Sequence, residues 1–293
     1  MERDVSPATL VVFPDAKYLR ALLKECAKAF FGKGNLRRCA LIDEESFSDC
    51  LILPKEGGKL TVDDCSRIID ESLLHPVEEE KKLFVLTSFD TASQLVQNKL
   101  LKILEEPPQG VYFLLGATSE GAVLPTVMSR VRKIAVPPFT EEAVLAALQR
   151  GHAREEGLSV AAAASGGVYS LAEELLAGGE NFRIAERLFE GRDLEALSRE
   201  VADKKDRSAL FAALALTARD LLLYKTGQGQ YASLKGENLQ RLAEDYSEGA
   251  LLAAARFIQS AEREVQFNAS MRQCLYTLGL RIQEEKAKWQ KLS

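Results

Sequence analysis

Residues 83–138 read LFVLTSFDTASQLVQNKLLKILEEPPQGVYFLLGATSEGAVLPTVMSRVRKIAVPP, and this stretch decides the fold. It holds two nearly continuous apolar runs, 83–87 and 111–115, which are typical of parallel strands buried on both faces. Between them, residues 92–106 carry apolar side chains at helical spacing. A further short strand is expected at 133–136. Strands that alternate with helices predict a parallel sheet with helices on both sides.

The same alternation extends back to the beginning of the sequence. Thr9–Phe13 predicts a strand, and Ala16–Phe31 predicts a helix with one apolar face. Residues 38–42 and 50–53 are further short β-like runs, and residues 62–74 predict another helix. The first half of the chain therefore reads as one α/β domain.

The pattern changes at Pro137 and Pro138, where we expect a domain boundary. Thr140 is a good helix N-cap, and nothing beyond it has strand character. Residues 139–178 read as a small unit of three helices, and residues 179–293 as a series of longer amphipathic helices.

The composition limits the classes of function. The formal net charge is -5 at pH 7, so the protein as a whole repels a phosphate backbone and autonomous tight DNA binding is not expected. No apolar run approaches the length of a membrane span, and the first residues do not resemble a secretion signal. We therefore expect a cytoplasmic protein that does not contact membranes.

The cysteines and histidines do not suggest a metal site. The five cysteines include no C-x-x-C pair, and their odd number in a chain of this kind argues against disulfides. Neither His75 nor His152 lies beside a nucleophile or a ligand motif, so packing or surface roles are expected for both. The sequence predicts no metal and no cofactor.

Two motifs carry a resemblance to a known family. Asn98–Pro108 (NKLLKILEEPP), the strand after it and Leu124–Val131 (LPTVMSRV) resemble the clamp-loader branch of the AAA+ proteins, specifically the delta-prime type of DNA polymerase III subunit. In that family a helix ending in Leu-Glu-Glu-Pro-Pro precedes the sensor strand, and a Ser-Arg-Cys motif follows at about this spacing. The resemblance extends in order of elements over residues 9–176.

The resemblance implies three domains. Residues 1–138 would form a degenerate AAA+-like, RecA-like α/β domain with a parallel sheet. Residues 139–178 would form a helical lid domain, and residues 179–293 a C-terminal all-α collar domain for oligomerisation.

The resemblance also assigns the candidate site residues Ser129 and Arg130. In clamp loaders the arginine of this motif reaches the γ-phosphate held by the neighbouring subunit, where its planar cation stabilises the transferring phosphoryl group. Val131 replaces the family's usual cysteine and leaves the charged group in place. The alternative is an ordinary surface arginine paired with an acid. Glu105 and Glu106, at a helix C-terminus, are either solvated acids or part of a structural or inter-subunit contact.

The first nucleotide-binding element is missing. A P-loop needs glycines between the first strand and the first helix, because several backbone N–H groups must turn toward the phosphates. The corresponding link here is Pro14-Asp15-Ala16-Lys17, which has no glycine and places a carboxylate where a triphosphate would lie. Lys17 is either a relic of the P-loop lysine or a solvated surface lysine.

Two further elements differ from the family pattern. The positions where relatives carry the Walker B Asp-Glu fall on Thr87 and Ser88, and we interpret the nearby Asp90, or else Thr91, as the N-cap of the next helix. A lid helix of the family begins with Gly-x-x-Arg, whereas Gly167–Ser170 offers serine. The family's four-cysteine zinc module is expected to be replaced by a short metal-free segment, residues 39–54.

These features predict a subunit without catalysis of its own. It would donate Arg130 to a clamp-loader ATPase subunit of the gamma/tau type and join a pentamer through its C-terminal helices. The resemblance implies the delta subunit as a second partner, with the sliding clamp and primer-template DNA met in the assembled complex. Two alternatives stay open: an AAA+ enzyme that binds ATP through an unrecognised loop, and a degenerate AAA+ scaffold that acts outside replication.

Overall fold

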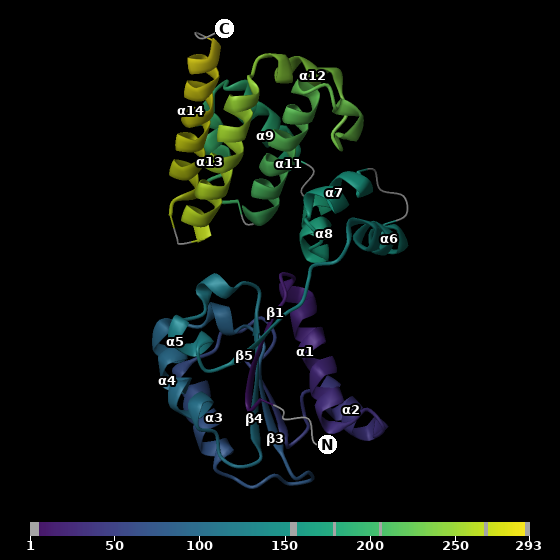
Figure 1. Ribbon diagram of the computed structural model, residues 1–293, viewed down its shortest axis with the longest axis vertical. Helices are drawn as coiled ribbons and strands as arrows, with labels where there is room; N and C mark the ends of the chain where they lie inside the picture. Colours follow the sequence, from purple (N-terminus) through teal and green to yellow (C-terminus); the bar gives the residue numbers. More distant parts are fainter. Residues whose placement is uncertain (1–5, 153–156, 178–179, 205–206, 267–268, 291–293) are drawn as a thin grey trace. The chain divides into compact units, whose positions relative to one another are not determined.

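The computed structural model describes residues 6–152, 157–177, 180–204, 207–266 and 269–290 (Figure 1). The chain divides into two compact units, residues 1–138 and 139–293. Each unit has its own buried apolar clusters.

The first unit is built on a five-stranded sheet in the order β2-β3-β4-β1-β5. All of the strand pairs are parallel, as the alternation of strands and helices predicts. Its elements are β1 (Ala8–Val12), α1 (Ala16–Phe31), α2 (Leu36–Asp43), β2 (Cys50–Leu53), α3 (Val62–Ser72), β3 (Lys82–Leu86), α4 (Gln94–Glu105), β4 (Val111–Ala117), α5 (Pro125–Met128) and β5 (Arg132–Ala135).

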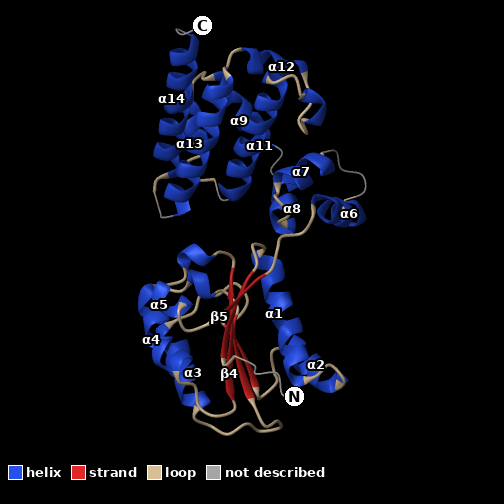
Figure 2. Ribbon diagram, in the orientation of Figure 1, coloured by secondary structure: helices blue, strands red, loops and turns tan. Residues whose placement is uncertain are grey.

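Helices cover both faces of this sheet, which appears in red between two helical layers in Figure 2. Because side chains alternate along a strand, neighbouring residues of β3 belong to different clusters. Phe84 and Leu86 pack with residues of α3, α4 and α5, whereas Leu83 and Val85 pack with residues of α1 and α2. All five residues of β3 are buried, as expected for a central strand of a parallel sheet.

The expectation of a β-like run at residues 38–42 is wrong, because these residues lie within helix α2. The side chain of Asn35 caps this helix by accepting a hydrogen bond from the backbone N–H of Arg38 at 3.1 Å. Only Ile42 of α2 is fully buried, so the helix contributes one apolar side chain to the cluster next to α1. Asn35 lies before residues 38–42, and its cap favours a helix where the apolar residues alone suggested a strand.

The regular elements in the described part of the second unit are all helices. Its elements are α6 (Glu141–Gly151), α7 (Leu158–Ala164), α8 (Tyr169–Ala177), α9 (Glu180–Glu190), α10 (Leu194–Glu200), α11 (Arg207–Lys225), α12 (Glu237–Glu244), α13 (Glu248–Gln266) and α14 (Met271–Gln290). Thr140 caps α6, as expected, by accepting from the N–H of Ala143 at 3.2 Å.

Helix α11 is the centre of this unit. Leu210 and Leu214 belong to the large cluster formed with α9, α12, α13 and α14. Ala209 and Ala213, on another face of the same helix, pack with residues of α6, α7 and α8. The first three helices and the later ones therefore share α11, and a separate lid and collar stay a prediction.

None of the helices in the part of the chain that the structure describes combines the length and the apolar character needed to cross a membrane.

Candidate functional site

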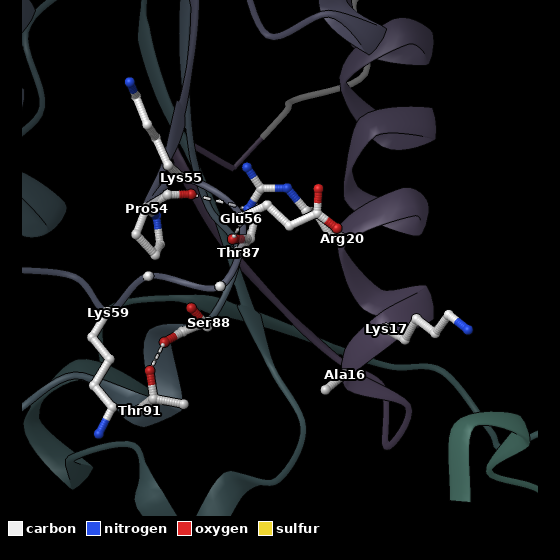
Figure 3. Close-up of a pocket in the computed structure, with 12 residues that line it drawn as sticks. Ala16, Lys17, Arg20, Pro54, Lys55, Glu56, Lys59, Thr87, Ser88 and Thr91 are labelled. Carbon is white, nitrogen blue, oxygen red and sulfur yellow. Dashed lines mark hydrogen bonds between the residues drawn. The ribbon is translucent and has the colours of Figure 1, made fainter. Parts of the chain in front are cut away.

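A pocket of about 490 Å³ lies at the carboxyl-terminal edge of the sheet (Figure 3). Its walls come from the first turn and a half of α1, from residues 54–59 after β2 and from residues 87–91 after β3. Open parallel sheets usually bind their ligands at this edge. The link between β1 and α1 and the end of β3, where the family holds phosphate and metal, both lie here.

Asp15 occupies the N-terminus of α1. Its side chain is fully buried, and its Oδ1 accepts a hydrogen bond from the backbone N–H of Tyr18 at 3.2 Å. The free N–H groups at the start of a helix attract anions, and a carboxylate from the chain itself meets that need here. A phosphate group at this position would face a buried negative charge.

Arg20 extends from α1 into the pocket and is held on all sides. Its Nε and Nη2 donate to the two carboxylate oxygens of Glu45, at 2.9 and 2.6 Å. Its Nη1 donates to the carbonyl oxygen of Pro54 at 3.0 Å and to Oγ1 of Thr87 at 2.8 Å. Figure 3 shows the guanidinium reaching from the helix toward Pro54 and Thr87. Every nitrogen of this guanidinium has a partner within the chain.

The electrostatic state of Glu45 follows from these contacts. Burial by itself would raise the pKa of its carboxyl group, but hydrogen bonds from Arg20 and Lys24 outweigh burial and hold the pKa below its ordinary value. Lys24 lies 2.7 Å from Oε1 of Glu45. The carboxylate therefore stays ionised and bridges two cations of α1.

The predicted Walker B positions contain no carboxylate in the structure. Thr87 is buried at the end of β3, where Arg20 donates to its hydroxyl group. Ser88 accepts a hydrogen bond from the hydroxyl group of Thr91 through its carbonyl oxygen at 2.9 Å. Lys17 is exposed, and its side chain points away from the other residues drawn in Figure 3.

The interpretation of Asp90 or Thr91 as a helix cap is wrong. Helix α4 begins at Gln94, and its N-cap is Ser93, which accepts from the N–H of Val96. Asp90 instead connects the ends of β3 and β4, because its Oδ2 accepts from the backbone N–H and the hydroxyl group of Thr118 at 2.8 and 2.5 Å. Asp90 itself lies in a short 3-10 turn, Phe89–Thr91, that precedes α4.

Arg130 lies on the surface between α5 and β5. Its Nε donates to Oε2 of Glu105 at 2.8 Å, and its Nη1 donates to the carbonyl oxygen of Thr126 at 2.9 Å and to Oγ of Ser129 at 3.3 Å. The side chain is 31% exposed. Nη2 of Arg130 donates no hydrogen bond within the described part of the chain.

Ser129 and Glu105 are thus brought together around Arg130. Ser129 is exposed, and its hydroxyl group donates to the carbonyl oxygen of Thr126 at 3.1 Å. Glu105, the last residue of α4, forms the structural contact that the sequence left open as one possibility. Glu106, the C-cap of the same helix, has no ion pair among the described residues.

The segment at residues 39–54 contains two thiols in different surroundings. Cys50 is buried in β2, and burial raises the pKa of its thiol to about 12. Cys39 lies 3.8 Å from the carbonyl oxygen of Lys33. A zinc ligand must be a thiolate, which the surroundings of Cys50 disfavour. Among the residues that the structure describes, no group of three or more His, Cys, Asp or Glu side chains is arranged to hold a metal ion.

In the second unit, Gly167–Ser170 precedes and begins α8, with Ser170 as the second residue of the helix. Gly167 has a φ of 86°, a left-handed conformation that favours glycine. Its carbonyl oxygen accepts from the N–H of Phe139 at 3.0 Å, so the turn holds the beginning of this unit.

Sequence reasoning missed Arg20, which lines the pocket, and Glu45, which forms an ion pair with it. One signal was available: Arg20 lies four residues after Ala16, so both face the same side of α1, toward the site of a P-loop. No local signal points to Glu45, which lies 25 residues further along the chain and has a φ of 57°.

The match to a family model falls almost wholly within the first unit. The family model described as "DNA polymerase III, delta subunit" matches residues 15–140. The tau subunit of DNA polymerase III from Bacillus subtilis is 23% identical over 265 residues, which cover 78% of this chain and 47% of the relative. The delta-prime subunit from Yersinia pestis is 31% identical over 99 residues, covering 33% of this chain and 29% of the relative.

The chain spans less than half the length of these curated relatives. A solved structure of a gamma-subunit-related DNA polymerase III protein from Thermotoga maritima is 21% identical and covers 96% of both chains, with a TM-score of 0.45. The family match contains the pocket, the Leu-Glu-Glu-Pro-Pro motif and the Ser129-Arg130 pair. The chain is therefore similar to subunits of DNA polymerase III, and the family model matches it over residues 15–140, less than half of its length.

Proposed function

We propose that this chain is a delta-prime-type clamp-loader subunit that does not hydrolyse ATP and donates Arg130 to the nucleotide site of a neighbouring ATPase subunit. The observation that carries the proposal is the contrast between two arginines. Arg20 donates to Thr87, at one of the expected metal positions, and has every nitrogen bonded. Arg130 is on the surface with its Nη2 unbonded within the described chain.

Three features of the pocket support the lack of hydrolysis. The start of α1 already has a buried carboxylate, that of Asp15. The end of β3 carries no carboxylate and offers only the hydroxyl groups of Thr87 and Ser88. Oxygen ligands that hold magnesium in a nucleotide site must have a free path to the phosphates. Arg20 blocks that path at Thr87, 2.8 Å from its oxygen. The pocket therefore lacks both the cradle and the metal site of a P-loop enzyme.

The surface around Arg130 supports a role in trans. All four residues of the edge strand β5, which begins two residues after Arg130, are exposed, and Ile134 is 43% exposed. An exposed edge strand with an apolar side chain is suited to contact another protein. Ser129, also exposed, accepts from Arg130 and completes the candidate site.

The proposed partners follow from the family. They are an ATPase subunit of the gamma/tau type and the delta subunit, with the sliding clamp and primer-template DNA in the assembled complex. The later helices around α11 would form the oligomerisation collar, and the setting would be the cytoplasm.

The test is hydrolysis in a reconstituted complex in which only the ATPase subunit next to this chain keeps a working nucleotide site. Arg130→Ala should lower the DNA-stimulated kcat by about 100-fold or more, since arginine fingers contribute about 10³ to 10⁵ in related phosphoryl transfers. The complex should assemble with unchanged mass.

Arg132→Ala is the matched control, because Arg132 is exposed two residues away and carries the same charge. It should reduce kcat by less than about threefold, the size expected for loss of a screened surface charge. An unchanged kcat in Arg130→Ala, or equal losses in both variants, would refute the finger.

A further inference from the structure

We infer that Glu105 is the positioning residue of the arginine finger: its carboxylate accepts Nε–H of Arg130 and so presents the Nη2 edge of the guanidinium to the phosphate of the neighbouring subunit. The inference rests on the proposed function. It links Glu105 of the Leu-Glu-Glu-Pro-Pro motif to Arg130 of the second motif, 25 residues later in the sequence.

The hydrogen bonds of Arg130 define a direction. A guanidinium has five N–H donors in one plane, on three nitrogens. Glu105 takes the donor on Nε, and the carbonyl oxygen of Thr126 and the hydroxyl group of Ser129 take those on Nη1. The two donors on Nη2 are the ones left for a ligand. A planar fork held on one side presents its other side at a fixed angle, which suits a phosphoryl group.

The elements that hold this arrangement are themselves anchored. Glu105 ends helix α4, where Pro107 follows and stops the helix. Thr126 belongs to α5, whose Val127 is fully buried against the sheet. Gln97 of α4 accepts from the backbone N–H of Leu124 at 2.9 Å through its side chain, and so ties α4 to the start of α5. Glu105 and Thr126, which both accept hydrogen bonds from Arg130, are therefore fixed relative to each other.

Folding stability does not account for Glu105. Its side chain is 54% exposed, and pairs of this exposure contribute little to stability in water. A carboxylate at a helix C-terminus is also disfavoured by the helix dipole. What the pair does is restrict a long side chain that would otherwise sample many rotamers. An arginine that is already ordered loses less entropy when it binds the transition state.

The experiment uses the same reconstituted complex and four variants of this chain. Glu105→Ala should lower kcat about two- to tenfold, the factor that corresponds to ordering one long side chain, and leave KM for ATP unchanged. Glu105→Gln keeps an oxygen that accepts Nε–H, so it should retain most of the wild-type kcat. Glu106→Ala removes the same charge one residue away and should behave as wild type.

The fourth variant combines Glu105→Ala with Arg130→Ala. If Glu105 acts through the finger, the double variant should be no slower than Arg130→Ala alone. An equal fold-loss from Glu105→Ala in both backgrounds would overturn the inference, because Glu105 would then act independently of Arg130. Glu105→Gln as slow as Glu105→Ala would also overturn it.

The two proposals fail in different ways. A slow Arg130→Ala with a normal Glu105→Ala removes only the positioning role. A normal Arg130→Ala removes the finger, and with it the role of Glu105. The melting temperatures of Glu105→Ala and Glu106→Ala should be equal in the isolated chain; a lower value for Glu105→Ala alone would assign its effect to stability and overturn the inference.

Discussion

The pocket at the start of α1 and the surface next to β5 each contain an arginine, but the two arginines differ in exposure and in how many of their nitrogens are bonded. Arg20 is 14% exposed, and each of its three nitrogens donates to a partner in the chain. Arg130 is 31% exposed, and only two of its nitrogens donate to a partner within the described residues. A cation whose every nitrogen is bonded within the chain stabilises its own domain, whereas a cation with an unbonded nitrogen can bind a ligand. The comparison separates an arginine bonded within its own domain from one that we propose to bind a ligand.

The largest effect on stability is expected from Arg20→Ala. It removes the bidentate partner of Glu45 and the donors for Thr87 and Pro54, so the free energy of opening of the α/β unit should fall by about 2 to 3 kcal/mol. Native-state hydrogen exchange of the amides of β1 and β3 measures this change.

Arg130→Ala is the matched control for that measurement. Its pair with Glu105 is exposed, so the same amides should change by less than about 0.5 kcal/mol. Equal losses in both variants would remove the distinction between the two arginines, and so would an unaffected Arg20→Ala.

A smaller effect should appear on acidification. The folded state lowers the pKa of Glu45 below the ordinary value of 4.5, so the unfolded state binds a proton first as the pH falls. The stability that Glu45 contributes is complete above that ordinary value and is lost as the pH falls through the lower folded value. The difference in opening free energy between the wild type and Glu45→Gln should therefore shrink below about pH 4.5. A constant difference would contradict the ion pair with Arg20.

Much of the fold could be predicted because its signals are local. Residues 16–31 and 50–53 form the helix and strand that the sequence predicts, with the same bounds, since the first has a clear helical apolar period and the second is a continuous apolar run. The error at residues 38–42 has a local cause as well: the cap that starts helix α2 is Asn35, outside the apolar run.

The candidate site was predictable only where it lies in a motif. The Ser129-Arg130 pair was found from its neighbours in sequence, and the loss of glycine at Pro14-Asp15 was also visible there. The partners of these residues were not predictable. Glu45 reaches Arg20, and Glu105 reaches Arg130, only after folding brings segments 25 residues apart to one place. When two partners lie 25 residues apart in the sequence, their contact depends on the tertiary structure and cannot be predicted from neighbouring residues.

Nucleotide binding by the isolated chain tests the central claim most directly. If Asp15 and Arg20 exclude a bound nucleotide, a calorimetric titration of the wild-type chain with ATP and magnesium should give no saturable heat up to about 1 mM nucleotide, the weak end of ordinary ligand affinities. Saturable binding of one ATP per chain, abolished by substitution of Lys17, would show a working nucleotide site and contradict the account.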